Sequence, residues 1–319
     1  MRYKGRFAPS PTGDLHLGSV ATALFATVAA RSAEGSIVLR VEDLDPPRTI
    51  PGSEASQLRD LAWLGFRFDE QPGDSGPSAP YRQSERLELY CAALDVLARE
   101  GHTYLCDCSR AEIARAASAP HEGEEGPRYP GTCRSFGMRE RPFRRAPAVR
   151  LAVPIGRTIR YEDVLRGICE SRPSDDVGDF VLRRGDGVFA YQLAVVVDDL
   201  AMGVTDVVRG ADLLSSAGRQ ALLFEMLGAT APRFLHVPLL VEAGGGERLA
   251  KRRSSYTIGM LRERSVSPVA ILSTLARAYG QTAPVAGDGA SFVDALARTF
   301  DPQLFPTSPV ALASEDLAA

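Results

Sequence analysis

The N-terminal third alternates between strand-like and helix-like segments. The short run Arg6-Phe7-Ala8 predicts a strand, which ends at the Pro- and Gly-containing segment 9–13. The Ala-rich run from Ser19 to Arg31 predicts a helix with Ser19 as its N-cap. The β-rich run from Ser36 to Val41 predicts the next strand. Alternating strands and helices are typical of a parallel α/β sheet.

Two further segments continue this pattern. Residues 53–64 predict a helix that closes at Gly65. Residues 84–100 predict another helix, because its apolar positions recur at helical spacing. These positions are Leu87, Tyr90, Leu94 and Leu97.

The middle of the chain has a different character. Residues 117–147 are rich in glycine, proline and charge and show little periodicity, which predicts an inserted, loop-rich subdomain. β-rich runs follow at 148–153 and 180–183. The turn at 184–187 predicts a hairpin whose second arm covers residues 189–197.

After this region the α/β pattern resumes. It comprises a strand over 206–209, a helix over 215–227 and a β-rich run over 234–241. A Gly-rich basic loop follows at 243–253. Helical patterns occupy the remaining chain, at 258–264, 268–279 and 291–299.

Composition excludes several classes of protein. The chain has 319 residues, of which 45% are hydrophobic and 24% charged, as in ordinary globular proteins. It holds no apolar run of the roughly 18 residues that span a bilayer and begins with no secretory signal, so we expect a cytoplasmic enzyme. With a net charge of −3, binding to nucleic acid would require a local basic face.

The segment 9–19 is a candidate phosphate-binding loop between a strand and a helix. Gly13 and Gly18 allow the backbone to approach a ligand, and a helix N-terminus offers free N–H groups and partial positive charge. His16 and Ser19 add donors that would stabilise charge on an attacked phosphate. Taken alone, this segment is better explained by chance or by a plain helix cap.

Residues 6–19, RFAPSPTGDLHLGS, resemble the ATP-binding motif of class I glutamyl-tRNA synthetases. Five further segments resemble this family in the family's own order: Val41–Asp45, Trp63–Phe66, Tyr81–Arg86, Tyr191–Asp199 and Val208–Leu214. The resemblance reaches residue 253. It implies a Rossmann-type parallel-sheet catalytic domain of an aminoacyl-tRNA synthetase with an inserted subdomain and a helical C-terminal part.

The loop segment Arg248–Arg252 resembles the second ATP motif of these synthetases, a mobile loop whose lysine neutralises the triphosphate. Lys251 stands at the position of that lysine. The chain departs from the family at Ala250, where a serine is usual, so one hydroxyl donor is missing. Without the other motifs, a solvated basic turn would be the simpler interpretation.

A substrate with two carboxylates and one ammonium requires arginines for the carboxylates and an acidic group for the amine. The resemblance implies that Arg6 and Arg209 address the carboxylates and that Glu42 holds the α-ammonium. It implies that Tyr191 adds a hydroxyl and a wall. Each residue singly would suit an ordinary ion pair, but together they stand at predicted strand ends, where α/β proteins bind ligands.

The resemblance thus implies three sets of site residues. The catalytic pair is His16 and Lys251. The ATP contacts are Pro9, Gly18, Ser19 and Lys251. The glutamate contacts are Arg6, Phe7, Ala8, Pro9, Ser10, Glu42, Tyr191 and Arg209.

Three of the five cysteines, Cys106, Cys108 and Cys133, crowd into one stretch of the insertion, which indicates metal or redox chemistry. Three thiolates and a fourth ligand satisfy tetrahedral Zn²⁺. A metal would supply folding free energy that a small loop-rich core lacks. Buried thiols without a metal are the alternative, and we expect Cys91 and Cys169 to be incidental.

The fourth zinc ligand has more than one candidate. The spacing resembles the zinc site of short glutamyl-synthetase-like enzymes, in which a tyrosine completes the set, and this implies Tyr129. His121 and His102 are competing candidates, since tyrosine is an unusual zinc ligand.

Only 68 residues follow Lys251, which leaves no room for the large helical anticodon-binding region of a full glutamyl-tRNA synthetase. We therefore expect no anticodon-binding domain. The chain resembles the short glutamyl-queuosine tRNA(Asp) synthetase family. That resemblance implies activation of L-glutamate by ATP without tRNA, followed by transfer to the cyclopentenediol of queuosine in the anticodon loop of tRNA(Asp).

The implied cofactors are one structural Zn²⁺ and the Mg²⁺ that accompanies ATP. The implied partners are L-glutamate, ATP and tRNA(Asp) carrying queuosine, with no membrane, and we expect a monomer. A candidate basic patch for tRNA comprises Arg139, Arg141, Arg144 and Arg145, although these residues equally suit a solvated loop. The alternatives are a truncated glutamyl-tRNA synthetase that charges the 3′ end, a nucleotidylyltransferase and a non-catalytic tRNA-binding paralogue.

These expectations divide the chain into four parts. Residues 1–100 form the first half of the Rossmann domain, and 186–235 form the second half. Between them, residues 101–185 form the zinc-containing, acceptor-type insertion. Residues 236–319 contain the second ATP motif and the helical C-terminal region.

Overall fold

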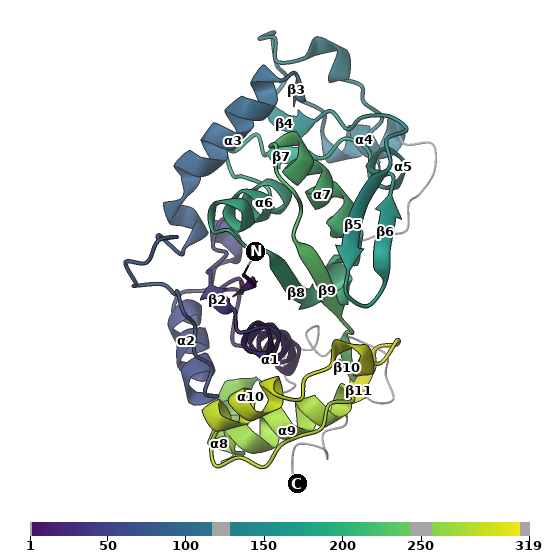
Figure 1. The fold of residues 1–319 in the computed structure, drawn as a ribbon. Coiled ribbons are helices and arrows are strands. Elements are labelled where there is room, and N and C mark those ends of the chain that lie inside the picture. The colour runs from purple at the N-terminus through teal and green to yellow at the C-terminus, as the bar shows by residue number, and fades with distance from the viewer. Residues whose placement is uncertain (1, 117–127, 243–256, 313–319) are drawn as a thin grey trace.

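A computed structural model describes residues 2–116, 128–242 and 257–312 of the chain. Its centre is a set of parallel strands with α1 (Leu17–Ser32) below it and α6 (Tyr191–Ala201) and α7 (Ala217–Met226) above it in the view of Figure 1. The predicted mixed α/β architecture with a parallel sheet is therefore confirmed.

The central strands pair in two parallel sets that meet side by side. They are β1 (Lys4–Phe7), β2 (Ser36–Leu39), β8 (Asp206–Gly210) and β9 (Arg233–Val237). β1 pairs with β2, and β8 pairs with β9 in the register that sets Arg209 opposite His236. Next to β8, the carbonyl of Lys4 accepts the N–H of Thr205 at 2.9 Å. The carboxyl ends of these strands therefore meet at one edge.

A hairpin that the sequence pattern did not reveal extends the sheet beyond β9. It consists of β5 (Ile159–Asp163) and β6 (Gly167–Ser171), which pair antiparallel. β5 joins the sheet in parallel, with Asp163 as the partner of Phe234. Although this hairpin belongs to the stretch predicted as an insertion, it brings Asp163 next to the central strands.

Helix α1 begins two residues earlier than predicted. Its N-cap is His16, whose Nδ1 accepts the backbone N–H of Ser19 at 3.3 Å. The prediction of Ser19 as the cap is therefore wrong, because His16 adopts the extended conformation of a cap (φ −108°, ψ 165°) and Ser19 is already helical. Eleven of the sixteen helix residues are buried, which explains why the run is Ala-rich and lacks a polar face.

The predicted second arm of the hairpin at 189–197 is wrong. The turn exists, since Arg183 and Phe189 form an antiparallel bridge next to β7 (Val181–Arg183). The chain then enters helix α6 instead of a strand. Residues 193–199 of that helix are all buried, and the apolar run 193–197 within them does not distinguish a buried helix from a strand.

Other predicted helices are present with shifted ends. They are α2 (Ser53–Trp63), α3 (Leu87–Arg99) and α7. The stretch predicted as an insertion contains α4 (Arg110–Ala116), α5 (Pro173–Asp176) and an antiparallel sheet of β3 (Thr103–Cys106), β4 (Ala148–Leu151) and β7. In Figure 1 this sheet lies at the opposite end of the molecule from the C-terminal helices.

The C-terminal region packs against α1. It comprises α8 (Ile258–Glu263), α9 (Pro268–Ala278), α10 (Gly289–Ala297) and the parallel pair β10 (Leu240–Glu242) and β11 (Val310–Leu312). The run predicted over 234–241 is divided at Pro238, which has no N–H to donate to a sheet. Within the described ranges, the helices are all too short or too polar to cross a membrane.

Candidate active site and metal centre

The first ATP-like motif forms the loop between β1 and α1. Gly13 has φ of +146°, a conformation that a side chain would strain. Its carbonyl accepts hydrogen bonds from Ser53 Oγ at 2.5 Å and from Gln57 Nε2 at 2.7 Å. Gln57 also donates to the carbonyl of Ser10 at 3.1 Å. Helix α2 therefore holds the loop from behind and leaves its other side to a ligand.

His16 lies at the point where this loop becomes a helix. Because Nδ1 accepts the Ser19 N–H, a neutral ring carries its proton on Nε2, which lies 3.1 Å from Ser19 Oγ. Burial lowers the pKa of His16, and the nearby charge of Asp212 opposes this shift. The ring is thus a neutral donor at neutral pH, placed beside the partial positive charge of the helix terminus.

A pocket of about 240 Å³ opens beside His16. It lies between the start of α1, the end of β8 and the start of β10, and its lining residues are His16, Gly18, Ser19, Thr22, Gly210, Asp212, Pro238, Leu239, Leu240 and Tyr279. This is the carboxyl edge of the parallel strands, where open α/β sheets bind ligands. The pocket unites the predicted ATP contacts Gly18 and Ser19 with His16.

The second ATP-like motif, with Lys251 and Ala250, lies outside the described residues. Residues 257 and 258, which follow this motif in the chain, contact the residues just before α1. Thr257 forms an antiparallel bridge with His16, and the N–H of Ile258 donates to the carbonyl of Leu15 at 2.9 Å.

The predicted glutamate residues Arg6 and Glu42 belong to a buried ionic network. Arg40, which is fully buried, donates to Glu42 Oε1 at 3.0 Å and to Asp199 Oδ1 at 2.7 Å. Arg6 lies 3.4 Å from the same Asp199 carboxylate and donates to the carbonyl of Val208 at 3.2 Å. The N–H of Glu42 donates to the carbonyl of Pro9 at 3.0 Å, which joins Glu42 to the first motif.

No pattern in the sequence indicated a role for Arg40, Asp198 or Asp199. Asp198 accepts hydrogen bonds from Arg86 Nε at 2.6 Å, Gln83 Nε2 at 2.7 Å and Tyr90 Oη at 2.9 Å. The sequence signal that could have revealed them is a charged residue inside an otherwise apolar segment, because a buried charge requires a partner. Which partners they have is a matter of tertiary structure.

Arg209 lies in a second buried polar group. Its Nε donates to His236 Nε2 at 3.0 Å, its Nη1 donates to Gln220 Oε1 at 2.6 Å, and its guanidinium stacks on Phe234 at 4.6 Å. Nη2 is buried and has no hydrogen-bond partner in the part of the chain that the structure describes. Burial lowers the pKa of Arg209 to about 10, so it is a cation at neutral pH.

Tyr191, at the start of α6, lies between these two groups. Burial raises the pKa of its hydroxyl. The negative charge of Glu42 also raises this pKa, whereas the positive charges of Arg209 and Arg6 lower it. The structure therefore brings four residues to one place: Arg6 of β1, Glu42 from the segment after β2, Tyr191 of α6 and Arg209 of β8. Phe7, Ala8, Pro9 and Ser10 lead from β1 into the adjoining loop.

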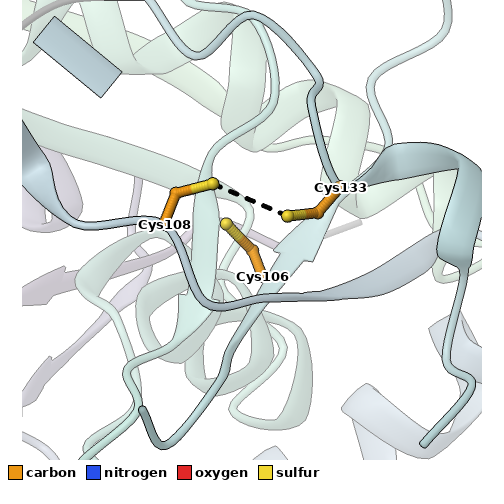
Figure 2. A group of neighbouring side chains, drawn as sticks. All are labelled: Cys106, Cys108 and Cys133. Carbon is orange, nitrogen blue, oxygen red and sulfur yellow. Dashed lines mark hydrogen bonds between the residues drawn. The ribbon is translucent and has the colours of Figure 1, made fainter. Parts of the chain in front are cut away.

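The three clustered cysteines lie close together in the insertion. The sulfurs of Cys106, Cys108 and Cys133 are all within 4.8 Å of one another, and Cys108 and Cys133 are 3.6 Å apart (Figure 2). Sulfurs bound to a tetrahedral Zn²⁺ at about 2.3 Å would be separated by roughly 3.8 Å. The three thiols therefore fit one zinc ion with little movement.

Tyr129 lies next to the three cysteines. Its hydroxyl is 3.4 Å from Cys106 Sγ and 3.5 Å from Cys108 Sγ, and it accepts the N–H of Cys133 at 2.9 Å. Arg150 stacks on its ring at 4.0 Å. Among the described residues, the metal-type cluster holds the three cysteines and does not include His102. The competing candidate His121 lies outside the described residues.

Much of the candidate basic patch is paired with acidic residues. Arg141 donates to Asp107 Oδ1 at 2.6 Å, and hydrogen bonds from Arg141 lower the pKa of that carboxyl. Arg144 contacts both Asp107 and Glu112, and Arg145 lies 3.7 Å from Glu112. These contacts favour the solvated-loop interpretation for most of the patch, and Arg139 remains as an exposed member.

Comparisons with known proteins agree with this geometry. The family model described as "tRNA synthetases class I (E and Q), catalytic domain" matches residues 3–297. A protein of Nitratidesulfovibrio vulgaris named "Glutamyl-Q tRNA(Asp) synthetase" is 50% identical, with 87% of this chain and 86% of that protein covered. A protein of the same name from Symbiobacterium thermophilum is 46% identical, with 99% and 97% covered.

A known crystal structure has a similar fold. A glutamate tRNA ligase from Elizabethkingia meningosepticum, crystallised in complex with its amino acid, superposes with a TM-score of 0.82 at 28% identity. The superposition covers 99% of this chain and 68% of that one. On these matches, the chain belongs to the class I tRNA synthetases of the glutamate and glutamine type and is a ligase.

Proposed function

We propose that the protein activates L-glutamate with Mg·ATP and transfers it to the cyclopentenediol of queuosine in the anticodon loop of tRNA(Asp). The observation that supports it is sequence similarity. Two proteins named "Glutamyl-Q tRNA(Asp) synthetase" are 50% and 46% identical to this chain, whereas the solved glutamate tRNA ligase is 28% identical.

Glutamate recognition is assigned to the group around Arg209. A buried cation requires an opposite charge, yet Arg209 forms no salt bridge within the described ranges and leaves Nη2 without a hydrogen-bond partner. A substrate carboxylate supplies both the charge and the acceptor. Arg6 faces the other carboxylate of glutamate. Tyr191 lines the site and offers its hydroxyl as a hydrogen-bonding group.

Glu42 is the proposed ligand of the α-ammonium. One of its oxygens is bound by Arg40, but a carboxylate accepts several hydrogen bonds, so capacity for an ammonium is left. Phe7, Ala8, Pro9 and Ser10 form the wall that follows β1. This arrangement would favour an acidic amino acid over a neutral one.

Activation requires that the α-carboxylate of glutamate attack the α-phosphorus of ATP while pyrophosphate leaves. Class I synthetases use ATP with Mg²⁺. Pro9, Gly18, Ser19 and Lys251 are the proposed ATP contacts, and His16, the α1 terminus and Lys251 stabilise the charge that develops on the phosphate. The glutamyl-adenylate then acylates a hydroxyl of the cyclopentenediol and AMP leaves, so no protein nucleophile is needed.

The proposed metal is one structural Zn²⁺ held by Cys106, Cys108, Cys133 and Tyr129. Three closely spaced thiols in a loop-rich region support this assignment. The ion would tie the two ends of the Cys106–Cys133 stretch together. It takes no part in the chemical steps.

The test is to incubate the pure protein with labelled glutamate, Mg·ATP and tRNA(Asp) that carries or lacks queuosine. We expect label only on the queuosine-containing tRNA. A second sample of that tRNA, trimmed of its 3′-terminal adenosine, should accept the same amount. Label on tRNA(Glu), or label that disappears with the terminal adenosine, would instead establish a truncated glutamyl-tRNA synthetase.

Glutamate-dependent exchange of pyrophosphate with ATP, without tRNA, tests the first half-reaction separately. Lys251→Ala should lower this rate by about a hundredfold or more, as expected for loss of a transition-state charge. Exchange that ignores glutamate would indicate a nucleotidylyltransferase. No exchange at all would indicate a non-catalytic paralogue.

A further inference from the structure

We infer that Asp163 and His236 are positioning residues that fix the guanidinium of Arg209 for a substrate carboxylate. This inference rests on the proposed function, because it takes the ligand of Arg209 to be glutamate. His236 and Asp163 are both fully buried, and neither belongs to the residues that the motifs indicated. They would set the affinity for the amino acid without touching it.

The contact with Arg209 dictates the proton position on His236. An arginine Nε–H only donates, so His236 Nε2, 3.0 Å away, must be the acceptor and carry no proton. The proton of the neutral ring is then on Nδ1, which lies 2.5 Å from Asp163 Oδ2. The order is therefore Arg209 Nε–H to His236, and His236 Nδ1–H to Asp163.

Asp163 is itself held in one orientation. Its Oδ1 accepts the backbone N–H groups of Leu165 at 3.0 Å and Arg166 at 3.1 Å, in the turn after β5. Oδ2 is thereby directed at His236. The hairpin β5–β6 thus contributes a carboxylate that fixes the tautomer of a histidine on β9, which then fixes an arginine on β8.

These contacts fix the orientation of the Arg209 guanidinium and leave Nη2 free to bind a ligand. His236 fixes Nε, Gln220 fixes Nη1, and Phe234 supports the face of the group. Nη2 is the nitrogen of this group that has no partner within the described ranges. A receptor that is already oriented loses little entropy when the carboxylate arrives, which raises affinity.

Two substitutions of His236 separate its two contacts. In His236→Asn, the amide nitrogen replaces Nδ1 and keeps the bond to Asp163, but the acceptor for Arg209 is lost. In His236→Gln, the amide oxygen reaches the place of Nε2 and keeps that acceptor. We expect His236→Asn to raise the KM for glutamate about tenfold or more, and His236→Gln to stay within about threefold of wild type.

Asp163→Asn tests the same contact between His236 and Arg209 with almost no change in side-chain shape. The backbone donors of Leu165 and Arg166 hold the amide oxygen at the Oδ1 position, so the amide NH₂ faces His236. This forces the histidine proton to Nε2, opposite the Nε–H of Arg209. Two donors then face each other, and we expect a rise in the KM for glutamate like that of His236→Asn.

The measurement is glutamate-dependent pyrophosphate exchange, with glutamate and ATP each varied. Positioning predicts a selective rise in the KM for glutamate, an unchanged KM for ATP and rescue in His236→Gln. The matched control is Tyr161→Phe, which removes a hydroxyl from a ring packed on Phe234 and should behave as wild type. If His236→Asn does not fold, Asp163→Asn carries the comparison.

The possible results distinguish a positioning role of His236 and Asp163 from a structural one. If wild-type protein exchanges pyrophosphate with glutamate but both His236→Asn and Asp163→Asn keep its KM, the positioning role is wrong and the proposed function stands. Equal losses in His236→Asn and His236→Gln, in kcat alone, would show a purely structural role. If wild-type protein shows no response to glutamate, the proposed function fails first, and this inference with it.

Discussion

Asp199 accepts a hydrogen bond of 2.7 Å from Nη1 of Arg40, and both side chains are buried. Asp199 also pairs with Arg6, and Arg40 also pairs with Glu42. The two proposed glutamate ligands Arg6 and Glu42 are thus joined through one ion pair beneath the site. Disturbing that pair should alter both stability and amino-acid recognition.

Asp199→Asn removes the charge of this pair without changing its shape. Arg40 and Arg6 lose their shared counter-ion, so we expect the free energy of unfolding to fall by about 3 kcal/mol. We also expect the KM for glutamate to rise, because Arg6 is no longer held. Urea unfolding and pyrophosphate exchange measure the two effects.

The control for this variant is Asp186→Asn, in an exposed pair with Arg184. An exposed ion pair contributes less than about 1 kcal/mol, so its loss should scarcely change the urea midpoint. If Asp199→Asn also changes the free energy of unfolding by less than about 1 kcal/mol, the buried pair does not stabilise the fold.

The cysteine cluster predicts about one zinc per protein chain. Cys106→Ser should lose the metal, since two thiols and a phenol bind zinc far more weakly. Tyr129→Phe keeps the ring beneath Arg150 but removes the hydroxyl, and should weaken zinc binding by about tenfold or more. Emission spectroscopy and titration with a chelator measure metal content and affinity.

Cys169→Ser is the matched control, because that cysteine lies on β6 away from the cluster. It should keep full metal content. Tyr129→Phe protein with wild-type zinc affinity would contradict the assignment of Tyr129 as a ligand and return His121 to consideration.

His16 has a structural and a proposed catalytic task that two variants distinguish. His16→Asn keeps an acceptor for the Ser19 N–H, because asparagine is a good N-cap, but removes the imidazole donor. We expect normal stability and a fall of about a hundredfold in the exchange rate. His16→Ala should lose the same activity and about 1 kcal/mol of stability as well.

The two parts of this prediction fail separately. Near-normal exchange in His16→Asn would exclude a catalytic role for the ring. Equal thermal stability of the alanine and asparagine variants would mean that the cap contributes nothing measurable to α1.

Acid should destabilise the protein below neutral pH through His236. Burial lowers its pKa below the unfolded value of about 6.5, against the opposing effect of Asp163, while Arg209 and Arg166 favour the neutral ring. As pH falls through 6.5, the unfolded chain binds a proton that the folded chain does not. The stability contributed by the neutral ring is therefore present above that pH and lost below it.

Urea midpoints between pH 5.5 and 7.5 test this expectation. The free energy of unfolding should fall with decreasing pH, by at most about 1.4 kcal/mol per pH unit for this one group. His236→Gln should show a shallower slope, since glutamine does not titrate. An identical slope in that variant would assign the acid sensitivity to other groups, of which His16 is the next candidate.

Local features of the sequence determined most of the architecture and the position of the proposed nucleotide pocket. A glycine-containing loop between a strand and a helix needs only short-range spacing to be recognised, and the three cysteines are likewise close in sequence. Helical periodicity identified α3, but it gave no signal in α6, because residues 193–199 of that helix are all buried and no exposed polar face marks it.

Tertiary structure alone decided what surrounds the proposed glutamate ligands. No local pattern relates the residues involved: Arg40 follows β2, Asp163 ends β5, Asp199 lies on α6 and His236 lies on β9. A buried charge shows in the sequence only as a charge in an apolar run. The identity of its partner depends on which strands lie side by side, since folding alone brings the two desolvated groups within hydrogen-bond distance.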